Sequence, residues 1–286
     1  MTTGDREGSV RCLSAAGFHH MAYREWGPPD AVRTAVCVHG LTRNGQDFEV
    51  LASALAADGW RVVCPDVAGR GGSDWLADPQ AYTYAQYLAD MTVLLARVAT
   101  ERVTWVGTSM GGLMGMMLAA QPGNPIERLL LNDIGPFIPK AALARLAAYV
   151  GADPRFTDMA AVERYVREVH APFGDLGEDG WRRLTEISVT LADGGGFRLH
   201  YDPRIGDAFR QKPPEDVDLW AIWDRISCPT RVLRGASSDL LLSDTAAEMA
   251  RRGPRAEVIE IAGCGHAPAL RTADQVALIR EWLNLE

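Results

Sequence analysis

Short apolar runs alternate along the chain with longer segments whose apolar residues recur at helical spacing. Residues 18–26 alternate apolar and polar side chains, which predicts an early antiparallel strand. Six later runs are built around apolar, often β-branched residues and predict buried strands, at 34–40, 61–66, 102–107, 128–133, 230–235 and 256–262. Segments of helical period, such as 47–59 and 84–99, lie between them. This alternation predicts the α/β class, with a mostly parallel sheet covered by helices.

The alternation stops after Pro136. From there to about residue 215 we find only amphipathic helical segments, at 140–151, 159–170 and 179–193, and no convincing strand. We therefore expect a helical cap at 136–215, inserted into a core domain made of residues 1–135 and 216–286. Proline-rich stretches bound this segment at both ends, as expected where one structural unit gives way to another.

Composition and charge narrow the functional classes. A chain of 286 residues with 47% hydrophobic and 23% charged residues is typical of a globular protein with a full core. Its net charge of −8 argues against a nucleic-acid partner, which usually requires a basic face. The sequence lacks both an apolar signal segment and a run of about 18 apolar residues, so we expect a cytoplasmic protein without membrane insertion. Its oligomeric state stays open.

Residues 103–112, VTWVGTSMGG, carry the most informative local pattern. A predicted strand runs into Gly107, Ser109 and Gly111, and a helix-like segment follows at once. Glycine on both sides of Ser109 predicts a turn too tight for side chains, which holds the serine in a strained backbone conformation and lifts its hydroxyl clear of the sheet. The turn would also aim the free N–H groups of the next helix at that hydroxyl.

The pattern G-x-S-x-G between a strand and a helix resembles the nucleophile elbow of the α/β-hydrolase family. Two further markers occur in the family's order: His39-Gly40 after an early strand, and a glycine-rich loop from Asp66 to Ser73 after the next one. The resemblance spans nearly the whole chain. It implies an α/β-hydrolase fold and a serine nucleophile at position 109.

A serine hydroxyl needs a base, and the base needs a carboxylate to orient it. Among the six histidines, His266 follows the last predicted strand, where the family places its base. The family order Ser, Asp, His indicates Asp239, in the loop after strand 230–235, as the acid. Asp133 is the rival, since some family members draw the acid from the strand before the cap. Asp244 is explained by a position at a helix N-terminus.

The resemblance also implies an oxyanion hole built from the backbone amides of Leu41 and Met110. His39 would then be structural and would fix the loop that carries Leu41. The sequence contains no metalloprotease, P-loop or dinucleotide-binding motif, and its five cysteines (Cys12, Cys37, Cys64, Cys228 and Cys264) form no C-x-x-C pair. We therefore expect reduced thiols and neither a metal nor an organic cofactor.

The reaction class follows from the nucleophile. Relatives that open epoxides or remove halogen attack with aspartate, so Ser109 indicates acyl transfer to a small-molecule ester. Carboxylic-ester hydrolysis is our first interpretation. Cleavage of a C–C bond or a lactone is the second, because Thr108 and Ala267 depart from the pattern of the C–C hydrolases. A ligand-binding protein with a silent triad is the third.

Substrate selection should come from the cap. Its aromatic residues and one residue of the acid loop are candidates to line an apolar pocket: Phe137, Phe173, Trp181, Phe197 and Leu240. The polar stretch from Arg198 to Arg204 is interpreted as a salt-bridged hinge between cap and sheet in preference to a substrate anchor.

Overall fold

A computed structural model of the chain describes residues 5–98, 101–211 and 213–284. Eight strands form one sheet in the order β1-β2-β4-β3-β5-β6-β12-β13, in which β1 and β2 run antiparallel to their neighbours and the others are parallel. Each of the seven predicted strands is present. The bounds are β1 Arg6–Ser14, β2 Gly17–Trp26, β3 Thr34–Val38, β4 Arg61–Pro65, β5 Val103–Thr108, β6 Ile126–Asn132, β12 Thr230–Gly235 and β13 Glu257–Ile261.

The sequence pattern missed β1. Only Val10 and Cys12 of its nine residues are buried, so the strand shows little hydrophobic alternation. It exists because it pairs with β2 along its whole length, from Arg6 opposite Glu25 to Ser14 opposite Gly17. Cross-strand pairing, which local pattern does not reveal, therefore sets this edge of the sheet.

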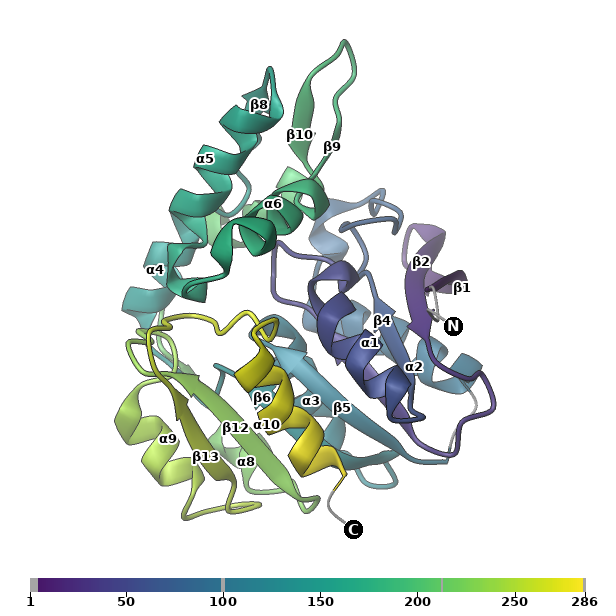
Figure 1. Ribbon diagram of the computed structural model, residues 1–286, viewed down its shortest axis with the longest axis vertical. Helices are drawn as coiled ribbons and strands as arrows, with labels where there is room; N and C mark the ends of the chain where they lie inside the picture. Colours follow the sequence, from purple (N-terminus) through teal and green to yellow (C-terminus); the bar gives the residue numbers. More distant parts are fainter. Residues whose placement is uncertain (1–4, 99–100, 212, 285–286) are drawn as a thin grey trace.

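Helices cover both faces of the sheet (Figure 1). On one face α1 (Glu49–Ala57) and α10 (Ala273–Leu283) lie side by side, and Leu51, Leu55 and Ile279 pack onto the strands. The other core cluster draws residues from α2, α3, α8 and α9, which span Tyr84–Val98, Met110–Ala119, Trp220–Trp223 and Ser243–Met249. Buried residues of α2 recur every three or four positions, as required of a helix with one face on a sheet.

The segment predicted as a cap lies above the carboxyl ends of the parallel strands (Figure 1). Its helices are α4 Lys140–Ala147, α5 Met159–Val169, α6 Gly177–Ile187 and α7 Asp207–Gln211. The prediction that it contains no strand is wrong. Short strands β8 (Arg155–Phe156), β9 (Val189–Leu191) and β10 (Phe197–Leu199) form a small sheet, and β7 (Phe137–Ile138) pairs with β11 (Val217–Asp218). Strands of two or three residues are too short to produce a period in the sequence.

Among the described residues, short 3₁₀ helices lie at Gly45–Phe48, Pro79–Ala81, Ala171–Phe173 and Pro203–Gly206. The last belongs to the polar stretch interpreted as a hinge. Its Asp202 carboxylate, fully buried, accepts hydrogen bonds from the hydroxyl of Tyr82 at 2.6 Å and from the guanidinium of Arg204 at 2.7 Å. The backbone N–H of Asp202 also donates to the carbonyl of Gly69, in the glycine-rich loop. The stretch is thus joined to the core by hydrogen bonds, while the Asp202–Arg204 ion pair lies within the stretch itself, and its role as a hinge stays a prediction.

No helix in the described parts of the chain combines the length and the apolar character that crossing a bilayer requires.

Candidate active site

Ser109 occupies the turn between β5 and α3 with a left-handed backbone, φ 51° and ψ −115°. The flanking glycines are required by the space around them. A Cβ atom on Gly107 would lie 2.4 Å from the carbonyl oxygen of Gly111, and one on Gly111 would lie 2.1 Å from that of Val38. The strained, glycine-flanked bend that the sequence predicts is therefore present, and non-glycine residues with positive φ concentrate at functional positions.

His266 lies in the loop after β13 and joins two other side chains. Its Nε2 is 2.9 Å from the hydroxyl oxygen of Ser109, and its Nδ1 is 2.8 Å from a carboxylate oxygen of Asp133. Since the carboxylate only accepts, Nδ1 carries the ring proton and Nε2 is left to accept from the serine hydroxyl. The side chain of His266 is 9% exposed and that of Asp133 is fully buried.

The carboxylate of Asp133 is held by two further donors. The backbone N–H of Gly235 donates to its Oδ1 at 2.7 Å, and the hydroxyl of Ser238 donates to its Oδ2 at 2.5 Å. Gly235 is the last residue of β12, the strand beside β6, and Asp133 follows the end of β6. Parallel strands that end together thus bring an acid and its donors to one edge of the sheet, where hydrogen bonds to a charged group are strong.

The prediction that Asp239 partners His266 is wrong. Its side chain is 49% exposed and faces the cap, where the guanidinium of Arg145 donates to both of its carboxylate oxygens, at 2.5 and 2.8 Å. Partial burial raises the pKa of Asp239, but the hydrogen bonds from Arg145 outweigh it and hold the pKa below its usual range. Asp133, the rival in the sequence, already fills the position beside the imidazole, so the loop after β12 contributes Ser238 there instead.

The two amides proposed for an oxyanion hole lie beside the serine. Met110 begins α3 directly after Ser109, and Leu41 lines the same cavity. Within the described residues, neither N–H donates to another protein group, so both are free for a ligand. The Leu41 carbonyl is fixed by Arg70, a fully buried residue whose Nε donates to it at 2.8 Å.

His39 is structural, as predicted. Its Nδ1 donates to the carbonyl of Gly40 at 2.7 Å, and its Nε2 accepts from the N–H of Val67 at 2.9 Å, which joins the two glycine-containing loops. Complete burial lowers the pKa of His39 to about 3, so its ring is neutral at physiological pH.

Two cavities of opposite character meet at Ser109. The first, which we call the apolar cavity, has a volume of about 490 Å³ and lies against α3 and under α4. The second, the polar cavity, has a volume of about 60 Å³ and adjoins the loops that carry His39 and His266. Residues of the apolar cavity include Leu41, Tyr82, Tyr84, Met110, Leu113, Leu143 and Leu240; those of the polar cavity include Thr42, Arg43, Asp47, Arg145, His170, Phe173, His266 and Arg271.

Two of the five predicted substrate contacts line these cavities: Leu240 the apolar one and Phe173 the polar one. The other three residues line neither. Trp181 packs beneath the guanidinium of Arg167, while Phe197 and Phe137 sit in β10 and β7 and take part in strand pairing. Aromatic residues in the cap thus serve its own small core, which their spacing in the sequence did not distinguish from a pocket.

The polar lining was not predicted. The ring of His170 lies against that of Phe173 with centroids 4.6 Å apart, and burial, followed by the nearby Arg43, lowers the pKa of His170. Arg43, Arg145 and Arg271 come from three separate parts of the chain. No local motif connects them, so only the folded structure could bring them together.

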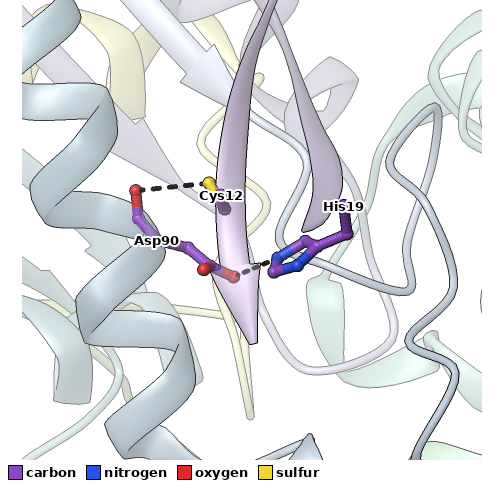
Figure 2. Close-up of side chains that lie close together, drawn as sticks. All are labelled: Cys12, His19 and Asp90. Atoms are coloured by element: carbon purple, nitrogen blue, oxygen red, sulfur yellow. Dashed lines mark hydrogen bonds and ion pairs between the residues drawn. The ribbon is translucent and has the colours of Figure 1, made fainter. Parts of the chain in front are cut away.

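Away from this site, Cys12, His19 and Asp90 place their ligand-type atoms within 4.8 Å of one another (Figure 2). Cys12 and His19 face each other across β1 and β2, and Asp90 reaches them from α2. His19 Nε2 is 3.0 Å from one oxygen of Asp90, and Gln86 donates to the other at 2.7 Å. Burial raises the pKa of the Cys12 thiol to about 12. A protonated thiol is a poor metal ligand, and the contacts fasten the hairpin to α2.

A serine hydroxyl bound to an imidazole, itself bound to a buried carboxylate, is the arrangement that serine hydrolases share. The protein is a serine hydrolase of the carboxylic-ester class, which confirms the first interpretation of the sequence. A sequence profile described as "Alpha/beta hydrolase family" matches residues 35–278, and the chain belongs to that family.

Similar proteins cover the chain from end to end. The 3-hydroxybutyrate-oligomer hydrolase of Cupriavidus necator is 46% identical over 292 residues, with 99% of each chain covered. A solved structure from Rickettsia typhi, described as that of a hydrolase, matches with a TM-score of 0.92 at 31% identity and covers 99% of both chains. An α/β hydrolase from Novosphingobium aromaticivorans matches with a TM-score of 0.86 at 36% identity, covering 99% of this chain and 98% of that one.

Proposed function

We propose that the protein hydrolyses short linear oligoesters of 3-hydroxybutyrate through an acyl-enzyme on Ser109. The observation that carries the proposal is the hydrogen-bonded set Ser109, His266 and Asp133, which opens at the serine onto the apolar and the polar cavity. Such an oligoester carries a methyl branch on every unit, a hydroxyl at one end and a free carboxylate at the other. A relative that is 46% identical and is named for such oligomers supports the same substrate class here.

Acylation begins when His266 Nε2 takes the proton of the Ser109 hydroxyl, and the serine oxygen bonds to the ester carbonyl carbon. The carbonyl oxygen becomes an oxyanion, which the amides of Leu41 and Met110 hold by hydrogen bonds. The C–O bond to the alcohol then breaks, and His266 passes its proton to the departing oxygen. The acyl group stays on the serine, and the alcohol leaves.

Deacylation repeats these steps with water. His266 removes a proton from the water molecule, whose oxygen attacks the acyl carbon, and the same two amides hold the second oxyanion. The bond to the serine oxygen breaks, the serine regains its proton from His266, and the acid departs. Asp133 stays ionised and stabilises the imidazolium that exists while the proton is in transit.

We also propose that residues 136–215 act as a cap that selects substrates. Its helix α4 contributes Leu143 to the apolar cavity and Arg145 to the polar one, whereas Ser109, Asp133 and His266 come from the core. The cap would therefore set which esters reach the serine without supplying a group that makes or breaks bonds.

The test is hydrolysis of the 3-hydroxybutyrate dimer and trimer, followed by chromatographic separation of the acids released. We expect turnover by the wild type, none by Ser109→Ala, and labelling of the wild type alone by a serine-reactive phosphonate. p-Nitrophenyl butyrate serves as a general ester control. If the enzyme turns over this control but leaves dimer and trimer intact, the proposed substrate class is wrong although the esterase chemistry stands.

A further inference from the structure

The polar cavity is rich in arginine. Three guanidinium groups line it, those of Arg43, Arg145 and Arg271, and Asp47 supplies the one carboxylate in its lining. The chain as a whole carries a formal charge of −8, so this concentration of arginine runs against the average of the molecule. Arginine N–H groups beside a catalytic serine can bind an anionic part of the substrate through charge-assisted hydrogen bonds.

The three arginines differ in how firmly they are held. Arg43 is buried and is fixed by Asp47 at 2.6 Å and by the hydroxyl of Ser188 at 2.6 Å. Arg271 donates to Glu49 at 2.7 Å. Neither can turn far without breaking these contacts, and the carboxylate paired with each offsets its charge.

Arg145 is the arginine best placed to bind a ligand. Asp239 accepts from its Nε and from one N–H of its Nη2, and the Tyr149 hydroxyl lies within hydrogen-bonding reach of the same guanidinium. A guanidinium has five N–H donors, so two remain after these three contacts. Its side chain is 38% exposed on the cap helix α4. Asp239 thus orients the group, and the N–H donors that remain can bind a second carboxylate, a ligand that suits a guanidinium well.

The position of His266 decides which end of an ester enters this cavity. The departing oxygen must receive a proton from His266 Nε2, so the alcohol part of the ester lies where both Ser109 and His266 are exposed. Both residues line the polar cavity, whereas the apolar cavity is lined by Ser109 without His266. The alcohol therefore lies on the arginine side, and the acyl chain lies in the apolar cavity.

From this arrangement we infer that the polar cavity is a carboxylate subsite for the leaving group, with Arg145 as its main contact and Asp239 as the residue that positions Arg145. The inference rests on the proposed function. In the last unit of a 3-hydroxybutyrate oligomer, two carbons separate the ester oxygen from the carboxylate carbon, so the carboxylate lies close to the ester group that Ser109 attacks. The enzyme then works from the carboxylate end and releases one 3-hydroxybutyrate at a time.

A kinetic comparison tests the subsite. The dimer as the free acid and as its methyl ester differ only in the charge at the leaving end. We expect the wild type to favour the acid by at least about tenfold in kcat/KM, mainly through KM, as expected for one charged hydrogen-bonded contact. Arg145→Gln should remove this preference, and Arg145→Lys should keep part of it. Arg182→Gln, a cap arginine on α6 that lines neither cavity, is the matched control and should keep the full preference.

Direction is read from the first product. A trimer whose terminal hydroxyl is acetylated should release unmodified 3-hydroxybutyrate first and leave an acetylated dimer. Release of acetylated monomer first, or equal use of the acid and its methyl ester by the wild type, overturns the inference. So does an acid preference that survives in Arg145→Gln.

A binding measurement separates failure of this inference from failure of the proposed function. Calorimetry with Ser109→Ala, which cannot turn over, should detect 3-hydroxybutyrate anion. The affinity should fall at least about tenfold in the double variant with Arg145→Gln. Equal binding by both proteins, or none by Ser109→Ala, contradicts the subsite even if oligomers are hydrolysed. The expected difference supports the subsite even if the oligomers are not hydrolysed.

Discussion

Ser238 donates its hydroxyl to the same carboxylate oxygen of Asp133 that binds His266, at 2.5 Å, although 105 residues separate the two in sequence. The residue after it, Asp239, points the other way. This relationship predicts that Asp133→Asn lowers kcat on p-nitrophenyl butyrate by about 10³- to 10⁴-fold, because an amide at this position favours the wrong imidazole tautomer.

Asp239→Asn is the matched control for that change, since it removes the same charge from the residue next to Ser238, which contacts Asp133. We expect a loss of at most about tenfold on the neutral ester. Circular dichroism and a thermal melt of both variants show whether each folds. If the two variants lose activity equally, or if Asp239→Asn loses more, Asp133 is not the acid that supports His266.

Leu143 allows a test of how the apolar cavity selects the length of the acyl chain. It is a half-buried residue of α4 that lines the apolar cavity alone. Leu143→Trp should fill part of the roughly 490 Å³ and shorten the acyl chain that fits. We expect kcat/KM for p-nitrophenyl octanoate to fall at least about tenfold relative to the acetate, while Leu143→Ala shifts the ratio the other way. An unchanged ratio in both variants would place the acyl chain elsewhere.

Gly111 provides a test of the tight turn. A Cβ there would lie 2.1 Å from the backbone oxygen of Val38, with no flexible side chain to yield. We expect Gly111→Ala to destabilise the fold by more than about 2 kcal/mol, the scale of forced overpacking, and to lower Tm by at least about 4 °C. Gly72→Ala is the control, because a Cβ at that position meets only ordinary contacts at 3.4 Å or more. Similar melts for the two variants would contradict the crowding argument.

His39 makes stability depend on pH. Its pKa is about 3 in the folded protein, below the ordinary 6.5 that the unfolded chain keeps. Between these values the unfolded state binds one more proton than the folded state, so the free energy of unfolding falls as the pH is lowered from 6.5. The contribution is up to about 1.4 kcal/mol per pH unit.

The measurement is urea unfolding of the wild type and His39→Asn at pH 7, 6, 5 and 4. Carboxylates contribute equally to both proteins, so the difference in slope isolates the histidine. The variant should be less stable at pH 7, where the amide of Val67 loses its acceptor, yet should show a shallower decline toward pH 4. Parallel declines would show that His39 protonates as readily in the folded state as in the unfolded chain.

Much of the fold could be predicted because its signals are local. The buried strands are apolar runs of five to seven residues, and the glycines on both sides of Ser109 predict the bend there. β1 was missed because its stability comes from pairing with β2. The strands of the cap were missed because two or three residues carry no period.

The site was predictable at Ser109, which follows the end of β5 directly and has glycines on both sides, and at His266, which lies in the loop after the last strand. The prediction of the acid failed because Asp133 and Asp239 both follow strands of the parallel sheet. Sequence order does not say which of the two loops turns toward His266. The arginines of the polar cavity depend on three distant segments meeting, which no single motif encodes. The order of the triad in the family favoured Asp239. In the structure, the end of β6 places Asp133 beside the imidazole of His266.

The division of labour between sheet and cap has an evolutionary consequence. Every group that transfers a proton or holds the nucleophile is anchored in the core, and α4 reaches both cavities from a separate segment joined at two points. Substitutions in that segment can therefore change which esters are hydrolysed, while the catalytic residues stay the same. New specificities can therefore arise from substitutions in the cap segment alone.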